Sequence, residues 1–313
     1  MKLILILSVI LFFQLLFLIG IAQNGVLQFN PVKDNNGKPL GKILNMVQDK
    51  NGYMWFASET NHCIYRYDGH RMTAYKHDDV NTNSLGGTSV NSVYADDAGM
   101  IWVGLGETGV DRYNPATGIF KHFSHVSNDS GSLATDGWKI MKDRKGRVWI
   151  GGHQGLDCLD EKTGKFIHYR NEPGNKKSLS SNFVWCMYED RQGAIWIGTG
   201  NPWFNKNPEE GGLNRLETDG SFTRYMHDPD DPNSLISNKV AAIYEDTHGS
   251  FWVGTSGDGL HTMDRTTGRF QRHLYNAKKP DNLSRPPLRP NSVNDKITFI
   301  TEDSIGIIWI GTM

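Results

Sequence analysis

Apolar positions alternate with polar ones along short segments of the chain from residue 42 onward, and turn residues separate one segment from the next. Residues 90–94, 109–113 and 120–123 are examples of such segments. Alternation of this kind, with turn signals roughly every 8–12 residues, is typical of antiparallel strands that are buried on one face. No stretch after residue 22 shows the periodicity of an amphipathic helix. The pattern therefore predicts an all-β fold.

The segments group into units that repeat along the chain. Each unit contains Asp-x-x-Gly-x-apolar-Trp-apolar, and its tryptophans recur at intervals of 47, 47, 47, 56 and 57 residues. We expect the Asp to bond back to the backbone of a hairpin turn and the Gly to take the positive φ that other residues resist. The repeated residues are Trp55, Trp102, Trp149, Trp196, Trp252 and Trp309; Asp49, Asp96, Asp143, Asp190, Asp246 and Asp303; and Gly52, Gly99, Gly146, Gly193, Gly249 and Gly306.

Each unit is predicted to form four short strands, of which the second contains the tryptophan. A four-stranded antiparallel sheet repeated roughly every 40–50 residues is the sequence mark of a β-propeller blade. We therefore predict an all-β propeller with five complete blades and the start of a sixth, as part of a larger, seven-bladed ring. A residue present once in every blade is explained by the blade itself, so the repeated Trp, Asp and Gly are interpreted as structural.

The chain stops at Met313, within the second strand of the sixth unit. A propeller closes its ring to remove unpaired sheet edges. We expect the ring to continue beyond this residue in a longer protein. The alternative is a short ring in which the N-terminal segment completes the last blade.

The residues that carry this pattern resemble the two-component regulator propeller repeat, V-x-x-I-x-x-D-x-x-G-x-[IL]-W-[IV]-G-T-x-x-G-L-x-R. The resemblance covers residues 42–313, and units two to five match it closely, including a linking Ser-Leu pair. The first unit departs from it, because Phe56-Ala57-Ser58 replaces Ile-Gly-Thr and Asn61-His62-Cys63 replaces the glycine before the third strand. The Ser-Leu pairs are Ser84-Leu85, Ser132-Leu133, Ser178-Leu179 and Ser234-Leu235.

This resemblance implies the extracytoplasmic sensor region of a hybrid two-component histidine kinase of the kind found in Bacteroidetes. Such sensors are expected to detect oligosaccharides and to act as homodimers in the full-length receptor. A transmembrane segment and kinase modules would follow the propeller, and none of them is in this sequence. No enzymatic activity and no cofactor are therefore expected of the chain itself.

The N-terminus predicts export. Lys2 precedes an apolar run from Leu3 to Ile21, and Gly20-Ile21-Ala22 has the small-x-small form of a cleavage site. We predict a signal peptide over residues 1–22, a polar lead-in segment over 23–41 and propeller repeats over 42–313. An uncleaved anchor is the alternative, because the run is close to bilayer-spanning length. In both cases the repeats lie outside the cytoplasm, in the periplasm or cell envelope.

Composition and cysteine content narrow the function further. The formal net charge is −1, which gives no general attraction to nucleic acid or anionic lipid, so any membrane contact is expected through the signal or a downstream segment. Three cysteines without metal-ligand spacing are interpreted as small core residues, with one disulfide left open. No metal site is predicted.

Candidate binding residues are those that depart from the repeat. Strand direction alternates, so the loops between strands two and three share a face with the loops that join one blade to the next. On that face we expect two inserted loops with unmatched aromatic and basic side chains, which could stack on sugar rings or hold an anionic group. We also expect unit-specific residues at the mouth of the central channel. The candidates are Trp203, Phe204, Glu107, His153, Asp258, Arg285 and Arg289.

Two other interpretations stay open. The inserted aromatics could cap the blade or meet a second propeller, and the whole chain could be a secreted propeller that only binds or scaffolds. The sequence is also similar to streptogramin lyase-type propellers, which act through a histidine and a divalent metal. Most histidines here occupy equivalent repeat positions, which favours the sensor over that enzyme.

Overall fold

The computed structural model describes residues 31–202, 210–256, 259–274 and 296–312. Every regular element within these residues is a β-strand. The strands form five four-stranded antiparallel sheets and one two-stranded sheet, and within each sheet consecutive strands are hydrogen-bonded neighbours. The predicted all-β fold with propeller blades is confirmed.

The first blade contains β1 (Ile43–Gln48), β2 (Met54–Ser58), β3 (Cys63–Tyr67) and β4 (Met72–Lys76). The second contains β5 (Val90–Ala95), β6 (Ile101–Leu105), β7 (Gly109–Asn114) and β8 (Ile119–Phe123). The third contains β9 (Lys139–Lys142), β10 (Val148–Gly152), β11 (Gly155–Asp160) and β12 (Lys165–Tyr169). The fourth contains β13 (Val184–Glu189), β14 (Ile195–Thr199), β15 (Gly212–Leu216) and β16 (Phe222–Tyr225). The fifth contains β17 (Val240–Glu245), β18 (Phe251–Thr255), β19 (Gly259–Asp264) and β20 (Arg269–His273), and the two-stranded sheet contains β21 (Ile297–Glu302) and β22 (Ile308–Thr312).

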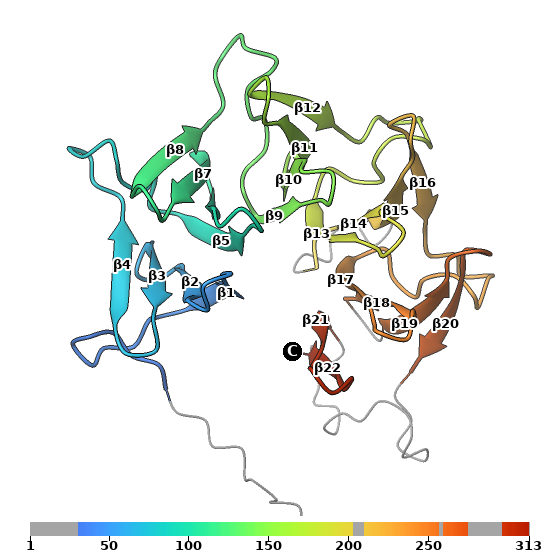
Figure 1. The fold of residues 1–313 in the computed structure, drawn as a ribbon. Helices are drawn as coiled ribbons and strands as arrows, with labels where there is room; N and C mark the ends of the chain where they lie inside the picture. Colours follow the sequence, from blue (N-terminus) through green and yellow to red (C-terminus); the bar gives the residue numbers. More distant parts are fainter. Residues whose placement is uncertain (1–30, 203–209, 257–258, 275–295, 313) are drawn as a thin grey trace, which may run out of the picture.

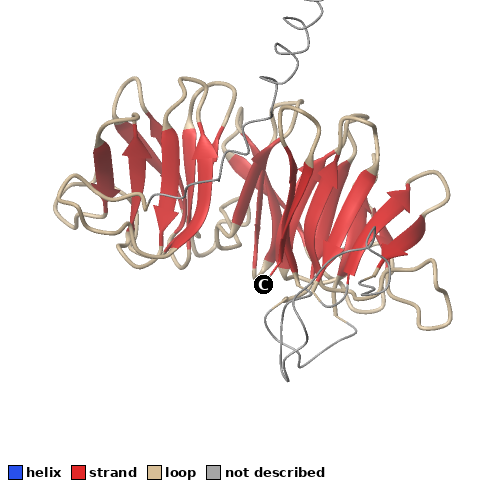
Figure 2. Ribbon diagram, turned by 90° about the horizontal axis from the view of Figure 1, so that it is seen from below, coloured by secondary structure: helices blue, strands red, loops and turns tan. Residues whose placement is uncertain are grey.

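The sheets follow one another around a common centre (Figure 1). The first strand of each sheet lies nearest the centre, and the fourth strand of each complete blade lies on the outside (Figure 1). Seen from below, the loops gather at the two ends of the strands (Figure 2). Residues from the first strands of different blades therefore face one another across the centre.

The repeated Asp closes each hairpin and also holds the tryptophan. In all six units its Oδ1 accepts the backbone N–H four residues further on, as the sequence predicts. Its Oδ2 accepts the indole Nε1–H of the repeat tryptophan at 2.8–3.0 Å. The turn glycine has φ between 81° and 87° in every unit. One carboxylate thus fixes both the turn and the orientation of the largest core side chain.

The tryptophans form the core between neighbouring blades. Trp55 packs with Val90 and Ile101 of the second blade, and Trp102 packs with Ile140 of the third. The first four repeat tryptophans are at most 1% exposed, whereas Trp309 on β22 is 49% exposed. Burial of this aromatic surface is the main force that holds one blade against the next.

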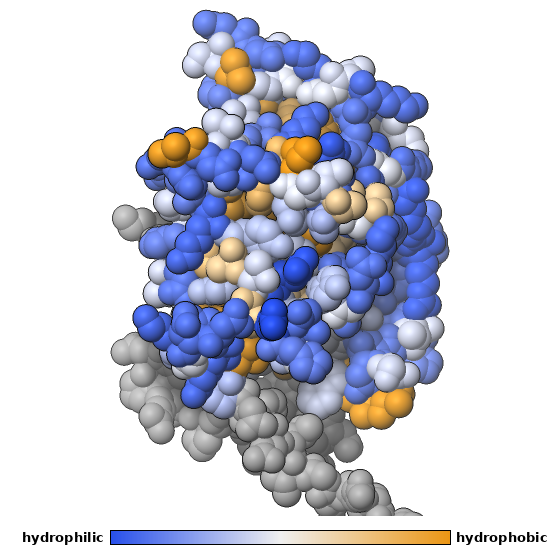
Figure 3. Space-filling model, turned by 60° about the vertical axis from the view of Figure 1, so that its left-hand side comes forward, coloured by the Kyte–Doolittle hydropathy of each residue, from blue (hydrophilic) through white to orange (hydrophobic). Residues whose placement is uncertain are grey.

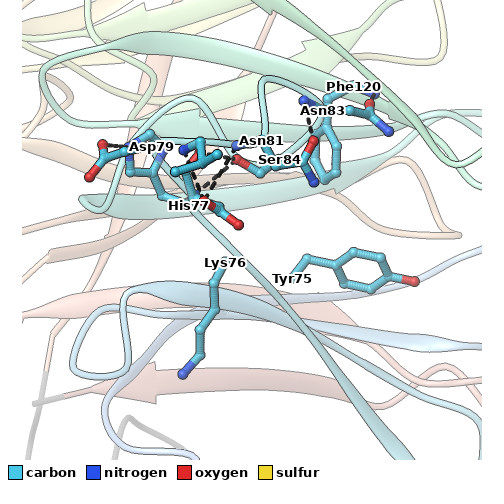
Figure 4. Close-up of a pocket in the computed structure, with 10 residues that line it drawn as sticks. Tyr75, Lys76, His77, Asp79, Asn81, Asn83, Ser84 and Phe120 are labelled. Carbon is cyan, nitrogen blue, oxygen red and sulfur yellow. Dashed lines mark hydrogen bonds and ion pairs between the residues drawn. The ribbon is translucent and has the colours of Figure 1, made fainter.

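The linkers between blades repeat a second set of contacts. The linking leucines are buried, and the Nδ1–H of His77, His125 and His227 donates to the carbonyl of the leucine that follows in each linker. In the third linker Asn171 takes this place and donates from Nδ2 at 2.7 Å. Figure 4 shows His77 among the linker residues Asp79 and Ser84, which line an open pocket of about 580 Å³. Because its contacts recur in other linkers, we interpret this pocket as structural.

The three cysteines are free thiols, so the disulfide left open by the sequence is not formed. Cys63 and Cys158 are buried, as expected for small core residues, and burial raises the pKa of the Cys158 thiol to about 12. In the view of Figure 3, hydrophilic residues dominate and hydrophobic ones form separate patches. Within the described residues, no helix has the length and apolarity needed to cross a membrane.

Candidate functional site

A cavity of about 490 Å³ lies at the centre of the blades, and the same repeat position contributes one residue to it from each sheet. This position lies eleven residues before the repeat tryptophan. We call these residues the channel residues: Leu44, Asn91, Trp138, Trp185, Ala241 and Thr298.

A β-bulge places most of these side chains. The pairing of first and second strands skips one residue between Val90 and Ser92, and the residue skipped is Asn91. The same irregularity passes over Leu44, Trp185, Ala241 and Thr298 in their sheets. A bulged residue leaves the regular alternation of the strand and its side chain is re-aimed. In the third blade Trp138 directly precedes β9, and its N–H donates to the carbonyl of Gly151 at 3.0 Å.

The channel residues differ chemically from blade to blade, unlike the repeated Trp, Asp and Gly. The rings of Trp138 and Trp185 lie 5.7 Å apart at 33°. Phe183 stacks on Trp185 at 6.0 Å, so three aromatic rings from the third and fourth blades form one surface. Such apolar faces, in a cavity that Asn91 and Lys139 also line, suit a ligand that has both a flat apolar side and hydroxyl groups.

A second cavity, of about 740 Å³, forms the mouth of the channel between the first three blades. It shares Glu59, Asn91 and Trp138 with the central cavity. Glu107 and His153, both predicted at the channel mouth, line it together. Glu107 lies in the β6–β7 loop and His153 in the β10–β11 loop, and both are exposed.

His153 is held by a carboxylate that the sequence analysis did not single out. Its backbone N–H donates to Asp136 Oδ1 at 2.6 Å, and its Nδ1 bonds the other carboxylate oxygen. The ring also meets Trp138 and Phe183 edge-on, at 4.9 and 4.5 Å between centroids. Burial of Asp136 works to raise its pKa, but the hydrogen bonds from His153 outweigh burial and the pKa lies below the ordinary value. An ionised carboxylate therefore stands beside the aromatic surface.

The other predicted site residues, Trp203, Phe204, Asp258, Arg285 and Arg289, lie outside the described residues. The described start of the fourth-blade insertion does reach the centre, because buried Pro202 lines the central cavity. Its carbonyl accepts hydrogen bonds from Lys296 Nζ at 2.9 Å and from Ser256 Oγ at 3.0 Å. Among the described residues, no group of three or more His, Cys, Asp and Glu side chains is placed to hold a metal ion.

Sequence reasoning missed the channel residues. Their signal was present, because aligning the units on the tryptophan leaves one position in the first strand that holds Leu, Asn, Trp, Trp, Ala and Thr in turn. The hydrophobic pattern does not show that this position faces the centre, since the bulge breaks the alternation there.

Comparison with known proteins gives the family of these blades. A family profile described as two-component regulator propeller matches residues 178–201 and 234–257, in the fourth and fifth blades. The fourth and fifth blades therefore carry two-component regulator propeller repeats. The resemblance that the sequence predicts is therefore confirmed.

A curated relative, histidine kinase P4 of Formosa agariphila, is 30% identical over 179 residues. The match covers 56% of this chain and only 12% of that kinase, so this chain spans about an eighth of the relative's length.

Two solved structures share the fold. One is the extracellular domain of a putative hybrid two-component system from B. thetaiotaomicron, at 23% identity and a TM-score of 0.50, which covers 91% of this chain and 40% of that one. The other is a catalytically inactive virginiamycin B lyase from Staphylococcus aureus, at 15% identity and a TM-score of 0.58, which covers 86% and 77%. At these identities the likeness shows the fold alone.

Proposed function

We propose that the chain is the extracytoplasmic ligand-sensing propeller of a two-component signalling histidine kinase, and that its ligand binds at the centre of the blades. The observation that carries the proposal is the single repeat position that lines the channel and varies from blade to blade. Structural repeat positions keep one residue type, whereas this one brings Asn, Thr and two Trp side chains to a shared cavity. A binding site built on a repeated scaffold is expected to vary at such positions.

The chemistry of the site favours an oligosaccharide. Trp138, Trp185 and Phe183 offer aromatic faces on which a sugar ring can stack. The carboxylates of Glu59 and Glu107 and the Asp136–His153 pair border the same mouth and can bond hydroxyl groups. Trp203, which directly follows Pro202 in the chain, remains a predicted contributor.

The similar proteins support an extracytoplasmic location for the propeller and a histidine kinase as the protein through which it signals. The similar domain from B. thetaiotaomicron is described as extracellular, and the similar curated protein as a histidine kinase. We propose that the chain is exported and that binding shifts how the propeller packs against the second copy in a homodimer. A ligand transmits a signal only if it binds one of two arrangements better than the other.

The test is a binding screen of the full chain against neutral and acidic oligosaccharides by isothermal titration calorimetry. Trp138→Ala and Trp185→Ala are each expected to weaken binding by about ten-fold or more, because each removes a stacking face. Phe120→Ala is the control, since Phe120 lines the outer linker pocket of Figure 4. Loss of binding in Phe120→Ala alone would move the site to the outer rim, and no binding of any sugar by the unaltered chain would overturn the proposal.

The same preparation tests the alternative suggested by the virginiamycin B lyase fold. Incubation with a streptogramin B antibiotic and divalent metal should leave the antibiotic intact if the chain is a sensor. Turnover that His153→Ala abolishes would establish a lyase instead.

A further inference from the structure

One polar side chain in the channel has a hydrogen-bonding group without a protein partner. Asn91, the bulged residue of β5, is 8% exposed, and its Nδ2 is buried with no acceptor in reach. It lines both the central cavity and the mouth. Because a buried N–H group is costly to leave unbonded, its free hydrogens point to a ligand that supplies an oxygen acceptor.

A second donor comes from the neighbouring blade. Lys139, the first residue of β9, lines the same central cavity. None of the ion pairs among the described residues includes Lys139, and the titratable side chain that interacts with it is the buried thiol of Cys186, which its raised pKa keeps uncharged. Burial lowers the pKa of Lys139, so an anion beside it would stabilise its charged form.

The cavity has one other feature that favours an anionic ligand, which is the balance of charged side chains along its lining. Its described charged residues are Lys42, Lys139, Lys296 and Glu59. Glu59 is the acidic one, and it already forms an ion pair with Lys42 at 2.7 Å. Among the described lining residues, basic side chains therefore outnumber acidic ones, and Trp138 and Trp185 line the same cavity as Lys139.

We infer that Asn91 and Lys139 form an anion-binding subsite in the central channel, and that the ligand is an oligosaccharide bearing a carboxylate or a sulfate ester. The inference rests on the proposed sugar-binding function and narrows its ligand. The sugar ring stacks on the aromatic surface of Trp138 and Trp185. Its anionic group accepts hydrogen bonds from Asn91 Nδ2 and Lys139 Nζ, and such charge-assisted bonds are the stronger kind.

Calorimetry on the full chain with three matched disaccharides tests the subsite. The probes are a disaccharide ending in glucuronate, the neutral disaccharide ending in glucose with the same linkage, and the neutral disaccharide carrying a 6-sulfate. We expect at least one anionic probe to bind about ten-fold or more tightly than the neutral one. The two anionic probes separate a carboxylate from a sulfate as the preferred group.

The variants assign the effect to residues. Lys139→Met should weaken the preferred anionic probe by about ten-fold and leave the neutral probe within about two-fold. Asn91→Asp should also weaken binding of the anionic probe, because it replaces a hydrogen-bond donor with a negative charge. It serves as the second variant if Lys139→Met fails to fold. Lys42→Met is the matched control from the same cavity, with a smaller expected effect because Lys42 is already paired with Glu59.

The outcomes separate the inference from the proposed function. Equal binding of neutral and anionic probes by the unaltered chain would overturn the anion subsite and leave sugar sensing standing. An anion preference that survives both Lys139→Met and Asn91→Asp would also overturn it. Failure of the unaltered chain to bind any sugar would overturn both.

Discussion

At the scale of single residues, different side chains make the same hydrogen bond between the third strand of a blade and the linker that precedes that blade. The third residue of the third strand accepts the backbone N–H of the residue that follows the linking Ser-Leu pair. Asp111, Asp157 and Asn214 do so through oxygen, and His261 does so through Nε2 at 3.1 Å. His261 is 0% exposed, and its Nδ1–H donates to the carbonyl of Val253. Both ring nitrogens are used, and the arrangement requires a neutral ring.

This arrangement makes stability depend on pH. Burial lowers the pKa of His261 from 6.5 to about 4 in the folded chain. Below its unfolded pKa the unfolded state binds the proton better, so stability falls as pH drops from about 6.5 through about 4. The contribution of His261 is present above this window. Between about pH 7 and pH 5 the loss should be about 2 kcal/mol.

Urea unfolding at these two pH values, on the unaltered chain and on His261→Asn, measures the effect. The substitution gives the fifth blade the asparagine that the fourth blade has at Asn214. The loss of unfolding free energy between pH 7 and pH 5 should then be smaller by about 2 kcal/mol. His70→Asn, at an exposed position, should leave the pH dependence unchanged. An unchanged pH dependence in His261→Asn would show that other groups cause it.

At the scale of the element, the hairpin of each blade depends on one aspartate. Asp49 accepts the N–H of Tyr53 at 3.1 Å and the indole N–H of Trp55 at 2.8 Å. Asp303 makes the equivalent contacts with Ile307 and Trp309 at 2.9 Å each. The two hairpins differ in burial, because Trp55 is 0% and Trp309 is 49% exposed.

Asp49→Ala should lower the free energy of unfolding by about 3 kcal/mol, because it leaves a buried indole N–H without an acceptor as well as opening the turn. Asp303→Ala should cost about 1 kcal/mol or less, since water can reach the indole of Trp309. Chemical denaturation followed by tryptophan fluorescence compares the two. Equal losses would mean that the backbone contacts of the turn, rather than the buried indole, carry the stability.

At the scale of the whole molecule, blades meet backbone to backbone at some glycines. A Cβ on Gly104 of β6 would lie 1.7 Å from the carbonyl oxygen of Gly137, in the segment that enters the third blade. That carbonyl also accepts a hydrogen bond from Ser92 Oγ at 3.0 Å. An added side chain at this position would therefore push the segment at Gly137 away from β6.

Gly104→Ala should therefore destabilise the chain by about 3 kcal/mol or more, through overpacking at the contact between blades. Gly118→Ala is the matched control. Gly118 has φ +71° and nothing within 4 Å of an added Cβ, so it should cost only about 1 kcal/mol of backbone strain. Thermal unfolding by circular dichroism ranks the two, and a smaller loss for Gly104→Ala would show that the blades can slide apart at little cost.

The packing of the blades against one another also limits how much of the candidate site the sequence could predict. Glu107 and His153 were expected at the channel mouth from the alternation of strand direction, and the structure brings them to one cavity. Asp136 was not expected beside His153, because it belongs to a linker and 17 residues separate the two in the chain. Linker paths depend on how neighbouring blades pack, and the repeat pattern does not encode that packing.

The sequence by itself determined the strands, the hairpin turns and the repeat, because these follow from local hydrogen bonding and burial within about ten residues of chain. It placed Asp190 and Gly193 in a turn beside the strand of Trp196 without any knowledge of the other blades. Only the tertiary structure decided that Asn91 and Lys139 share a cavity. They lie on different sheets, and they meet because burial of the tryptophans packs each blade against the next and the bulge of β5 directs Asn91 to the common centre.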